Sequence, residues 1–260
     1  MLPDLPAHSD LPEPARTTPH APEPPAAEAV PARRRGQAWA EILLCSGYPT
    51  QLLLGAGLQA VGIAAVTADG TLSATFVFAL ALSDTVVLLV LIWWLLIQGG
   101  ERPRDVFLGR RPVRGEAVVG VLSVPFVVAL IVVLSLAIRA FVPFLRNVPV
   151  NPLEGLLGTQ TGLLAFLFVV IVAGGLREEL QRAFLLHRFR HNLGSAGLGL
   201  VVTSLAFGLG HTLQGWDAAI LTGALGAAWG AIYLARGSAI ASIVSHSLFN
   251  CGELLRAFLR

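Results

Sequence analysis

The sequence predicts an all-α protein, a polytopic bundle of about seven transmembrane helices. Hydrophobic residues make up 55% of the 260 residues and charged residues only 13%, about half the charged share of an ordinary soluble domain. So few charges cannot cover a water-exposed surface, and we therefore expect lipid to be the main solvent. The apolar residues also gather in long runs, with arginines in the gaps between them.

The amino-terminal segment, residues 1–35, differs from the rest of the chain. It is rich in Pro, Ala and Glu and shows no apolar periodicity, so it cannot bury enough surface to become ordered. We expect a disordered tail here. A signal peptide would place its apolar core much nearer Met1.

Seven apolar stretches follow the tail, each close to the about 20 residues that a helix needs to cross the hydrocarbon core. We expect amino-terminal transmembrane helices within 36–150 and a second group within 151–260. The second group is distinguished by polar residues at membrane depth. The expected spans are 40–66, 72–98, 116–142, 161–190, 195–214, 217–235 and 238–258.

The arginines predict the orientation of these spans, because cytoplasmic loops carry an excess of positive charge. Arginines cluster before the first span and after the second, fourth and sixth, whereas the intervening loops contain only Arg146. We therefore expect an integral protein of the cell (inner) membrane with a cytoplasmic amino terminus. Arg256 and Arg260 at the opposite terminus fit this pattern less well.

Charge and cysteine content argue against several other classes of protein. The arginines lie in short clusters between apolar runs rather than on one soluble face, so no nucleic-acid partner is expected. The two cysteines, Cys45 and Cys251, lie beside or inside apolar segments. They suggest neither a disulfide framework nor a structural zinc site.

Ionisable residues inside the expected spans are the main functional signal, because each costs at least about 2.5 kcal/mol to insert at the centre of a bilayer. For two of them we expect ordinary structural roles. Asp84 would hydrogen-bond a neighbouring helix, and Arg139 lies near enough to a helix end to reach water. The others are Arg177, Glu178, Glu179, Arg182, His211, His246 and Glu253.

The adjacent carboxylates Glu178 and Glu179 lie in an otherwise apolar stretch. Neighbouring helical residues point about 100° apart, so the two cannot share a face. Arg182 follows Glu178 by four residues, and we expect these two to pair. The competing interpretation is a salt-bridged helix end just outside the membrane.

Two histidines on later spans complete the cluster. His246 and Asn250 are four residues apart and therefore lie on one helix face, while His211 ends the preceding polar motif, Phe207-x-x-x-His211. At about 1.5 Å of rise per residue, Glu178, His211, His246 and Asn250 all fall in or near the middle third of the membrane. We expect them to converge in one cavity.

A Glu pair with a following Arg, then Phe-x-x-x-His, then His-x-x-x-Asn, in this order on successive membrane helices, resembles the CAAX prenyl endopeptidase and bacteriocin-processing (CPBP, Abi) family. The resemblance covers residues 161–258. It implies that 151–260 forms the CPBP-like catalytic helices of an intramembrane endopeptidase. The implied partners are the lipid bilayer and a membrane-associated peptide or protein substrate.

The first motif departs from the family pattern. The family usually has Glu-Glu-x-x-x-Arg, whereas Glu178, Glu179 and Arg182 are one residue closer together. Alignment on Arg182 places Arg177 where the first Glu should be. Alignment on the Glu pair keeps both carboxylates and displaces the arginine.

The resemblance implies the role of each residue. Peptide hydrolysis needs a base to activate water and donors to stabilise the oxyanion. Glu178 would be the base, with Glu179 as the second candidate, and His211 would position the same water. His246 and Asn250 would be the oxyanion donors, and Arg182 would hold the helices together.

Family members have been called metalloproteases, and Glu178, His211 and His246 would be the ligands if a zinc ion were bound. We expect no cofactor, because no His-Glu-x-x-His motif is present and a metal-free glutamate mechanism accounts for the motifs. The alternatives are a catalytically silent scaffold or immunity-type homologue and a proton-relaying transporter. A serine mechanism at Ser245 or Ser247 lacks the Gly-x-Ser-x-Gly setting.

Overall fold

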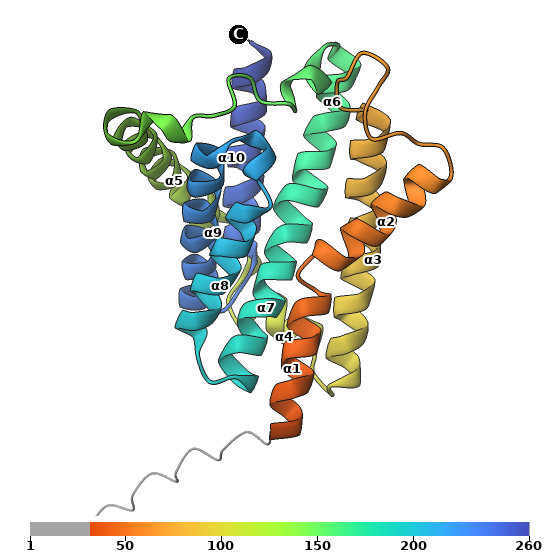
Figure 1. Ribbon diagram of the computed structural model, residues 1–260. Helices are drawn as coiled ribbons and strands as arrows, with labels where there is room; N and C mark the ends of the chain where they lie inside the picture. Colours follow the sequence, from red (N-terminus) through yellow and green to blue (C-terminus); the bar gives the residue numbers. More distant parts are fainter. Residues whose placement is uncertain (1–31, 260) are drawn as a thin grey trace, which may run out of the picture.

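The computed structural model describes residues 32–259, and these form an all-helical protein. Its helices lie around a central helical run, some of them parallel and others antiparallel to it (Figure 1). Most of the expected tail, residues 1–31, lies outside the described residues, and α1 begins at Ala32. The helices are α1 Ala32–Leu44, α2 Tyr48–Ala60, α3 Ala74–Gln98, α4 Pro103–Phe107, α5 Val113–Phe141, α6 Gln160–Val169, α7 Glu178–Asn192, α8 Ala196–Leu209, α9 Trp216–Arg236 and α10 Ile240–Phe258, with a π-helix at Val170–Arg177 and 3-10 turns at Pro143–Leu145, Glu154–Leu157 and Thr212–Gln214.

Three of the described helices are long and apolar enough to cross a membrane, namely α3, α5 and α9. A fourth helix, α8, is apolar but shorter. The predicted all-helical class is therefore confirmed, with three helices that could span a membrane, whereas the expected seven spans are not confirmed.

The expectation of one continuous span over 40–66 is wrong. This stretch forms the end of α1 and all of α2, with a break at Gly47, whose φ of 88° lies in the left-handed region that favours glycine. Pro49 lies in the first turn of α2, where its missing N–H costs no helical hydrogen bond. Each helix has 13 residues and is only about 20 Å long.

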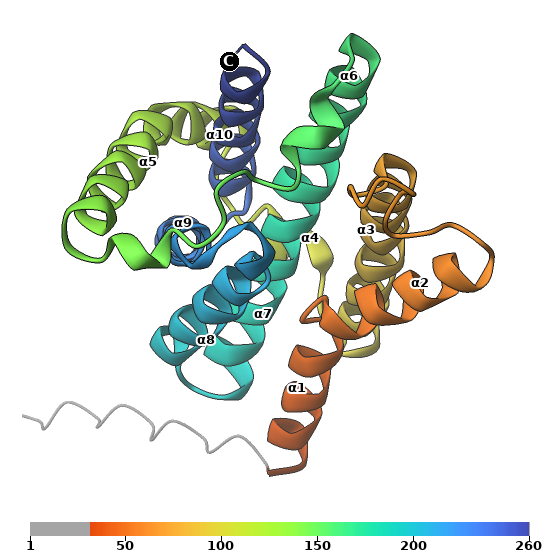
Figure 2. The same cartoon turned by 45° about the horizontal axis from the view of Figure 1, so that its top comes forward.

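The run α6–π–α7 passes through the middle of the molecule, with α8 on one side and α1 on the other (Figures 1 and 2). Its lower half is buried because apolar side chains meet it from both directions. Phe184 and Phe189 pack with Leu88 and Ile92 of α3, and Leu186 packs with α9. A helix surrounded in this way can hold polar groups away from both lipid and bulk water.

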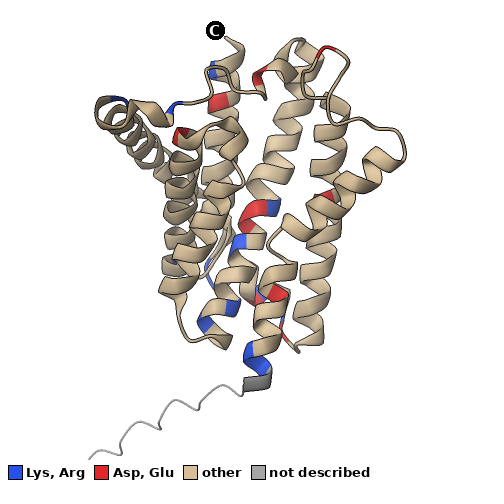
Figure 3. Cartoon of the chain, in the orientation of Figure 1, with Lys and Arg blue, Asp and Glu red and all other residues tan. Residues whose placement is uncertain are grey.

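The loops that carry most of the arginines gather at one end of the bundle, where α1 begins (Figure 3). Arg188 at the end of α7 pairs with Glu41 of α1 and with Glu101 after α3. Arg236 at the end of α9 pairs with Glu116 of α5 at 2.6 Å. The expected grouping of the loops after the second, fourth and sixth spans is therefore present in the fold.

Candidate functional site

The π-helix Val170–Arg177 leads directly into the Glu pair. Its wider i→i+5 turns change which residues face each neighbour, and such segments often occur at functional sites. α10 approaches it closely: a Cβ added to Gly175 would lie 3.2 Å from the Cα of Ser247, and one added to Gly174 would lie 2.7 Å from the Asn250 amide nitrogen. The glycines therefore let α10 bring its polar face against the start of α7.

Glu179 lies at the centre of a buried network. Its side chain has no exposed surface, and its Oε1 atom accepts hydrogen bonds from Arg182 and, at 2.8 Å, from Nδ1 of His246. The expected pairing of Arg182 with Glu178 is therefore wrong. A residue three positions away is as good a helical neighbour as one four away, and Arg182 joins the carboxylate that is buried and needs a cation.

Glu178 points to the same histidine from a more open position. Its side chain is 18% exposed, and its Oε2 atom lies 3.9 Å from Nε2 of His246. This separation is too long for a direct hydrogen bond, but it is one that a single water can bridge. The two ring nitrogens of His246 thus face the two carboxylates separately.

Two aromatic side chains fix the His246 ring. The indole of Trp229 stacks on it with ring centroids 3.7 Å apart and planes 15° apart, and Phe207 meets it edge-on at 6.1 Å. The Arg182 guanidinium lies over the Phe207 ring at 4.5 Å. Sequence reasoning missed Trp229, because a tryptophan in an apolar span gives no sign of what it stacks on.

His211 and Asn250 lie at the edge of this cluster. His211 lies two residues beyond the end of α8, with its Nδ1 atom 2.8 Å from the carbonyl oxygen of Phe207 and its ring 4.9 Å from the Phe207 ring. Among the described residues, no hydrogen bond or ion pair joins His211 or Asn250 to Glu178, Glu179 or His246. The structure thus brings Glu178, Glu179, Arg182 and His246 together, with His211 beyond Phe207 and Asn250 against the π-helix.

Within residues 32–259, no group of three or more His, Cys, Asp or Glu side chains is arranged to hold a metal ion. The zinc set considered from the sequence, Glu178, His211 and His246, is therefore not assembled. Nδ1 of His246 is bound to Glu179 and Nδ1 of His211 faces a backbone carbonyl, so the Nε2 atom is the ring nitrogen that remains available on each histidine, and these atoms are not grouped with a third ligand among the described residues.

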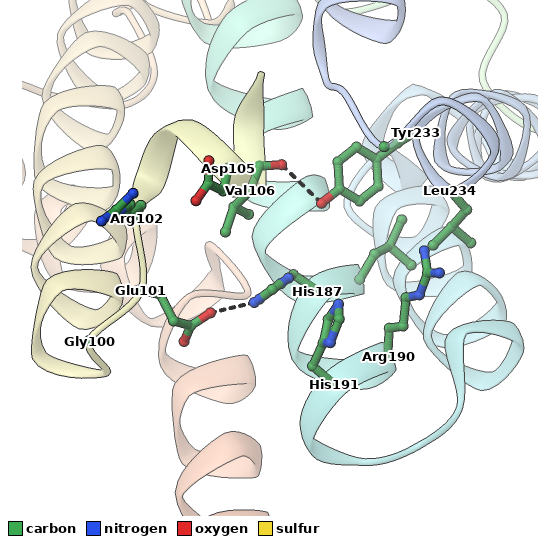
Figure 4. Close-up of a pocket in the computed structure, with 12 residues that line it drawn as sticks. Gly100, Glu101, Arg102, Asp105, Val106, His187, Arg190, His191, Tyr233 and Leu234 are labelled. Atoms are coloured by element: carbon green, nitrogen blue, oxygen red, sulfur yellow. Dashed lines mark hydrogen bonds and ion pairs between the residues drawn. The ribbon is translucent and has the colours of Figure 1, made fainter. Parts of the chain in front are cut away.

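A separate cavity of about 500 Å³ lies between the α3–α4 loop, the end of α7 and the end of α9 (Figure 4). His187 hydrogen-bonds Glu101 at its edge, and the Tyr233 hydroxyl donates to the carbonyl of Val106 at 3.1 Å. None of the predicted site residues lines this cavity. The Glu pair therefore lies outside this cavity.

Comparison with known proteins identifies one family. Residues 159–252 match the family described as type II CAAX prenyl endopeptidase Rce1-like. No curated protein and no solved structure matches the chain. The matched region contains the π-helix, the Glu pair, His211, His246 and Asn250. The predicted resemblance of this part of the chain to the CAAX prenyl endopeptidases, a family of proteases, is therefore confirmed.

Proposed function

We propose that this protein is an intramembrane endopeptidase in which Glu178 activates a water molecule to cleave a peptide bond of a membrane-associated substrate. One observation carries the proposal. Glu178 Oε2 and His246 Nε2 lie 3.9 Å apart, within the matched family region, with the rest of the His246 ring held by Glu179 and Trp229. One water bound by both atoms would be placed beside a base and a fixed imidazole.

The neighbours of His246 support separate roles for the two carboxylates, with Glu178 as the base and Glu179 as the residue that orients His246. Glu179 is paired with Arg182 and acts only as an acceptor, so the proton of its contact with His246 is on Nδ1. Nε2 is then free to accept a hydrogen bond from water or, once protonated, to donate to an oxyanion. Fixing one nitrogen of a catalytic histidine with a buried carboxylate is the arrangement that sets its tautomer in other hydrolases.

The proposed reaction is a hydrolysis that needs no other reactant. Glu178 takes a proton from the bound water, and the resulting hydroxide attacks the substrate carbonyl carbon. The oxyanion of the tetrahedral intermediate is stabilised by the Asn250 amide and, when its Nε2 atom carries a proton taken up from solvent before the reaction and kept throughout it, by His246; the family resemblance assigns both residues to this task. The intermediate collapses as the C–N bond breaks, and the proton held by Glu178 passes to the leaving amine.

The location at mid-membrane favours a substrate that reaches the site from the bilayer. We further propose that the chain crosses the inner membrane with its amino terminus in the cytoplasm, because the arginine-bearing loops lie at the end where α1 begins. Seven crossings would require α1 and α2 to cross the membrane together, and α6–α7, α8 and α10 to cross it beside α3, α5 and α9. The substrate would then meet Glu178 within the hydrocarbon layer.

The test uses purified protein and libraries of membrane-embedded peptides. Replacement of Glu178 with Gln keeps the side-chain shape and removes the base, so cleavage should fall by about 10²- to 10⁴-fold. Glu253→Gln is the matched control, because Glu253 is an exposed carboxylate of α10 that pairs with Arg256. A chelator titration in the same assay should leave cleavage unchanged.

Unaltered cleavage by the Glu178 variant would show that the base is elsewhere. A catalytically silent scaffold or immunity-type homologue is the second candidate, and the shortened Glu-Glu-x-x-Arg motif favours it. It predicts that the wild type cleaves no library member, although it binds membrane partners. Cleavage lost on chelation would instead support a metal mechanism.

A further inference from the structure

A second buried ion pair, between Arg177 and Asp84, lies next to Glu178. Arg177, the last residue of the π-helix, places Nη2 3.3 Å from Oδ2 of Asp84 in α3 and 4.0 Å from Oε1 of Glu178. Arg177 is 7% exposed and Asp84 has no exposed surface. The Arg177 guanidinium therefore lies close to two carboxylates. It is nearer to Asp84, which is outside the family motifs, than to Glu178.

Asp84 is held in place by α2, independently of Arg177. The hydroxyl of Thr50 donates to Oδ1 of Asp84 at 2.5 Å, and the amide of Gln51 donates to Oδ2 at 3.3 Å. These contacts confirm the expectation that Asp84 hydrogen-bonds a neighbouring helix. They also fix the position of its negative charge.

The other side of the Arg177 guanidinium is fixed by the break between α1 and α2. Nη1 donates to the Gln181 side chain at 2.9 Å, and Gln181 donates to the carbonyl of Cys45 at 2.9 Å. A Cβ added to Gly47 would lie 3.1 Å from the Gln181 amide nitrogen, at a φ that disfavours any side chain. The break between α1 and α2 therefore packs against Gln181, the side chain that accepts the hydrogen bond from Arg177.

We propose that Asp84 is a positioning residue that holds the Arg177 guanidinium away from Glu178, so that Glu178 remains free to bind and deprotonate water. The inference rests on the proposed role of Glu178. A guanidinium binds a carboxylate through two parallel hydrogen bonds when nothing competes for it. Without the charge of Asp84, Arg177 would turn to Glu178, and the oxygens of Glu178 would be occupied by that pair.

The test is a pair of substitutions with opposite effects. Asp84→Asn keeps the side-chain shape and the Thr50 contact but removes the charge. We expect kcat to fall by about 10- to 100-fold, part of what a positioned base contributes, with KM changed by less than about twofold. Adding Arg177→Gln removes the competing cation, and kcat should return to within about threefold of wild type.

A merely structural role would give a different pattern, because removing a second buried partner would not restore the rate. Glu116→Gln alone and combined with Arg236→Gln is the matched control, since this pair also joins a buried carboxylate to an arginine but lies at the end of the bundle. Thermal unfolding of every variant corrects kcat for the folded fraction. The double control variant should therefore have the same kcat as Glu116→Gln alone.

Two outcomes would overturn the role of Asp84: wild-type kcat in Asp84→Asn, or no recovery in the double variant. The proposed function fails separately. If cleavage survives Glu178→Gln, both the function and this role are refuted. If cleavage depends on Glu178 but the double variant stays as slow as Asp84→Asn, this role alone is refuted.

Discussion

The two adjacent carboxylates should differ sharply in what they contribute to stability. Glu179→Ala removes the one carboxylate that pairs with Arg182 among the described residues and leaves that guanidinium only 4% exposed. Breaking a buried ion pair by removing one partner costs about 3–5 kcal/mol. The same change also removes the acceptor that holds His246. A loss of this size is a large part of the about 5–15 kcal/mol that stabilises a typical native protein.

Glu178→Ala should cost much less. The side chain is 18% exposed, and its closest charged contacts, to Arg177 and His246, are 4.0 and 3.9 Å long. Truncating a partly exposed group that makes no direct hydrogen bond changes stability by about 1 kcal/mol or less. The expected difference between the two alanine variants is therefore about 2–4 kcal/mol.

Thermal unfolding of purified protein in one detergent, followed by far-ultraviolet circular dichroism, measures this difference without any substrate. The Glu179 variant should unfold at a clearly lower temperature than the Glu178 variant, or fail to accumulate as folded protein. Glu253→Ala, which removes an exposed carboxylate, sets the baseline. Equal unfolding temperatures for the Glu178 and Glu179 variants would refute the assignment of the ion pair to Glu179.

Two further predictions concern packing and pH. Gly175→Ala should destabilise the protein by about 1–3 kcal/mol in thermal unfolding, because the new methyl group would collide with Ser247. The control Gly252→Ala, whose new methyl group would meet nothing within 4 Å, should be neutral. Equal effects of the two substitutions would contradict the close approach of α10 to the π-helix. Burial alone raises the pKa of Glu101, but its hydrogen bond with His187 and the neighbouring guanidinium lower this pKa below its ordinary value. A lowered folded-state pKa stabilises the protein above the unfolded-state pKa of about 4.3. The stability lost in Glu101→Gln should therefore be present above the unfolded-state pKa of Glu101 and decline as the pH falls through its folded-state pKa, and a difference that does not decline at acid pH would exclude this charge effect.

Much of the fold could be predicted from the sequence, because the length of an apolar run sets the length of the helix that must bury it in lipid. The ranges expected for the second, third and sixth spans correspond closely to α3, α5 and α9. The break at Gly47 could not be predicted in the same way. An apolar run looks continuous whether or not a single glycine adopts a positive φ, and here Gly47 adopts one at the point where Gln181 packs beside it.

The sequence alone determined which residues are costly in a membrane and that they lie on separate helices, since a charge in an apolar run is visible without coordinates. Only the tertiary structure decided their partners. Arg182 had a carboxylate within reach at either three or four positions, and the contact of Glu179 with His246 selected Glu179. Likewise Arg177 faces Asp84, from a helix far away in sequence. Such choices depend on how helices rotate and pack against one another, which the order of residues along one helix does not specify.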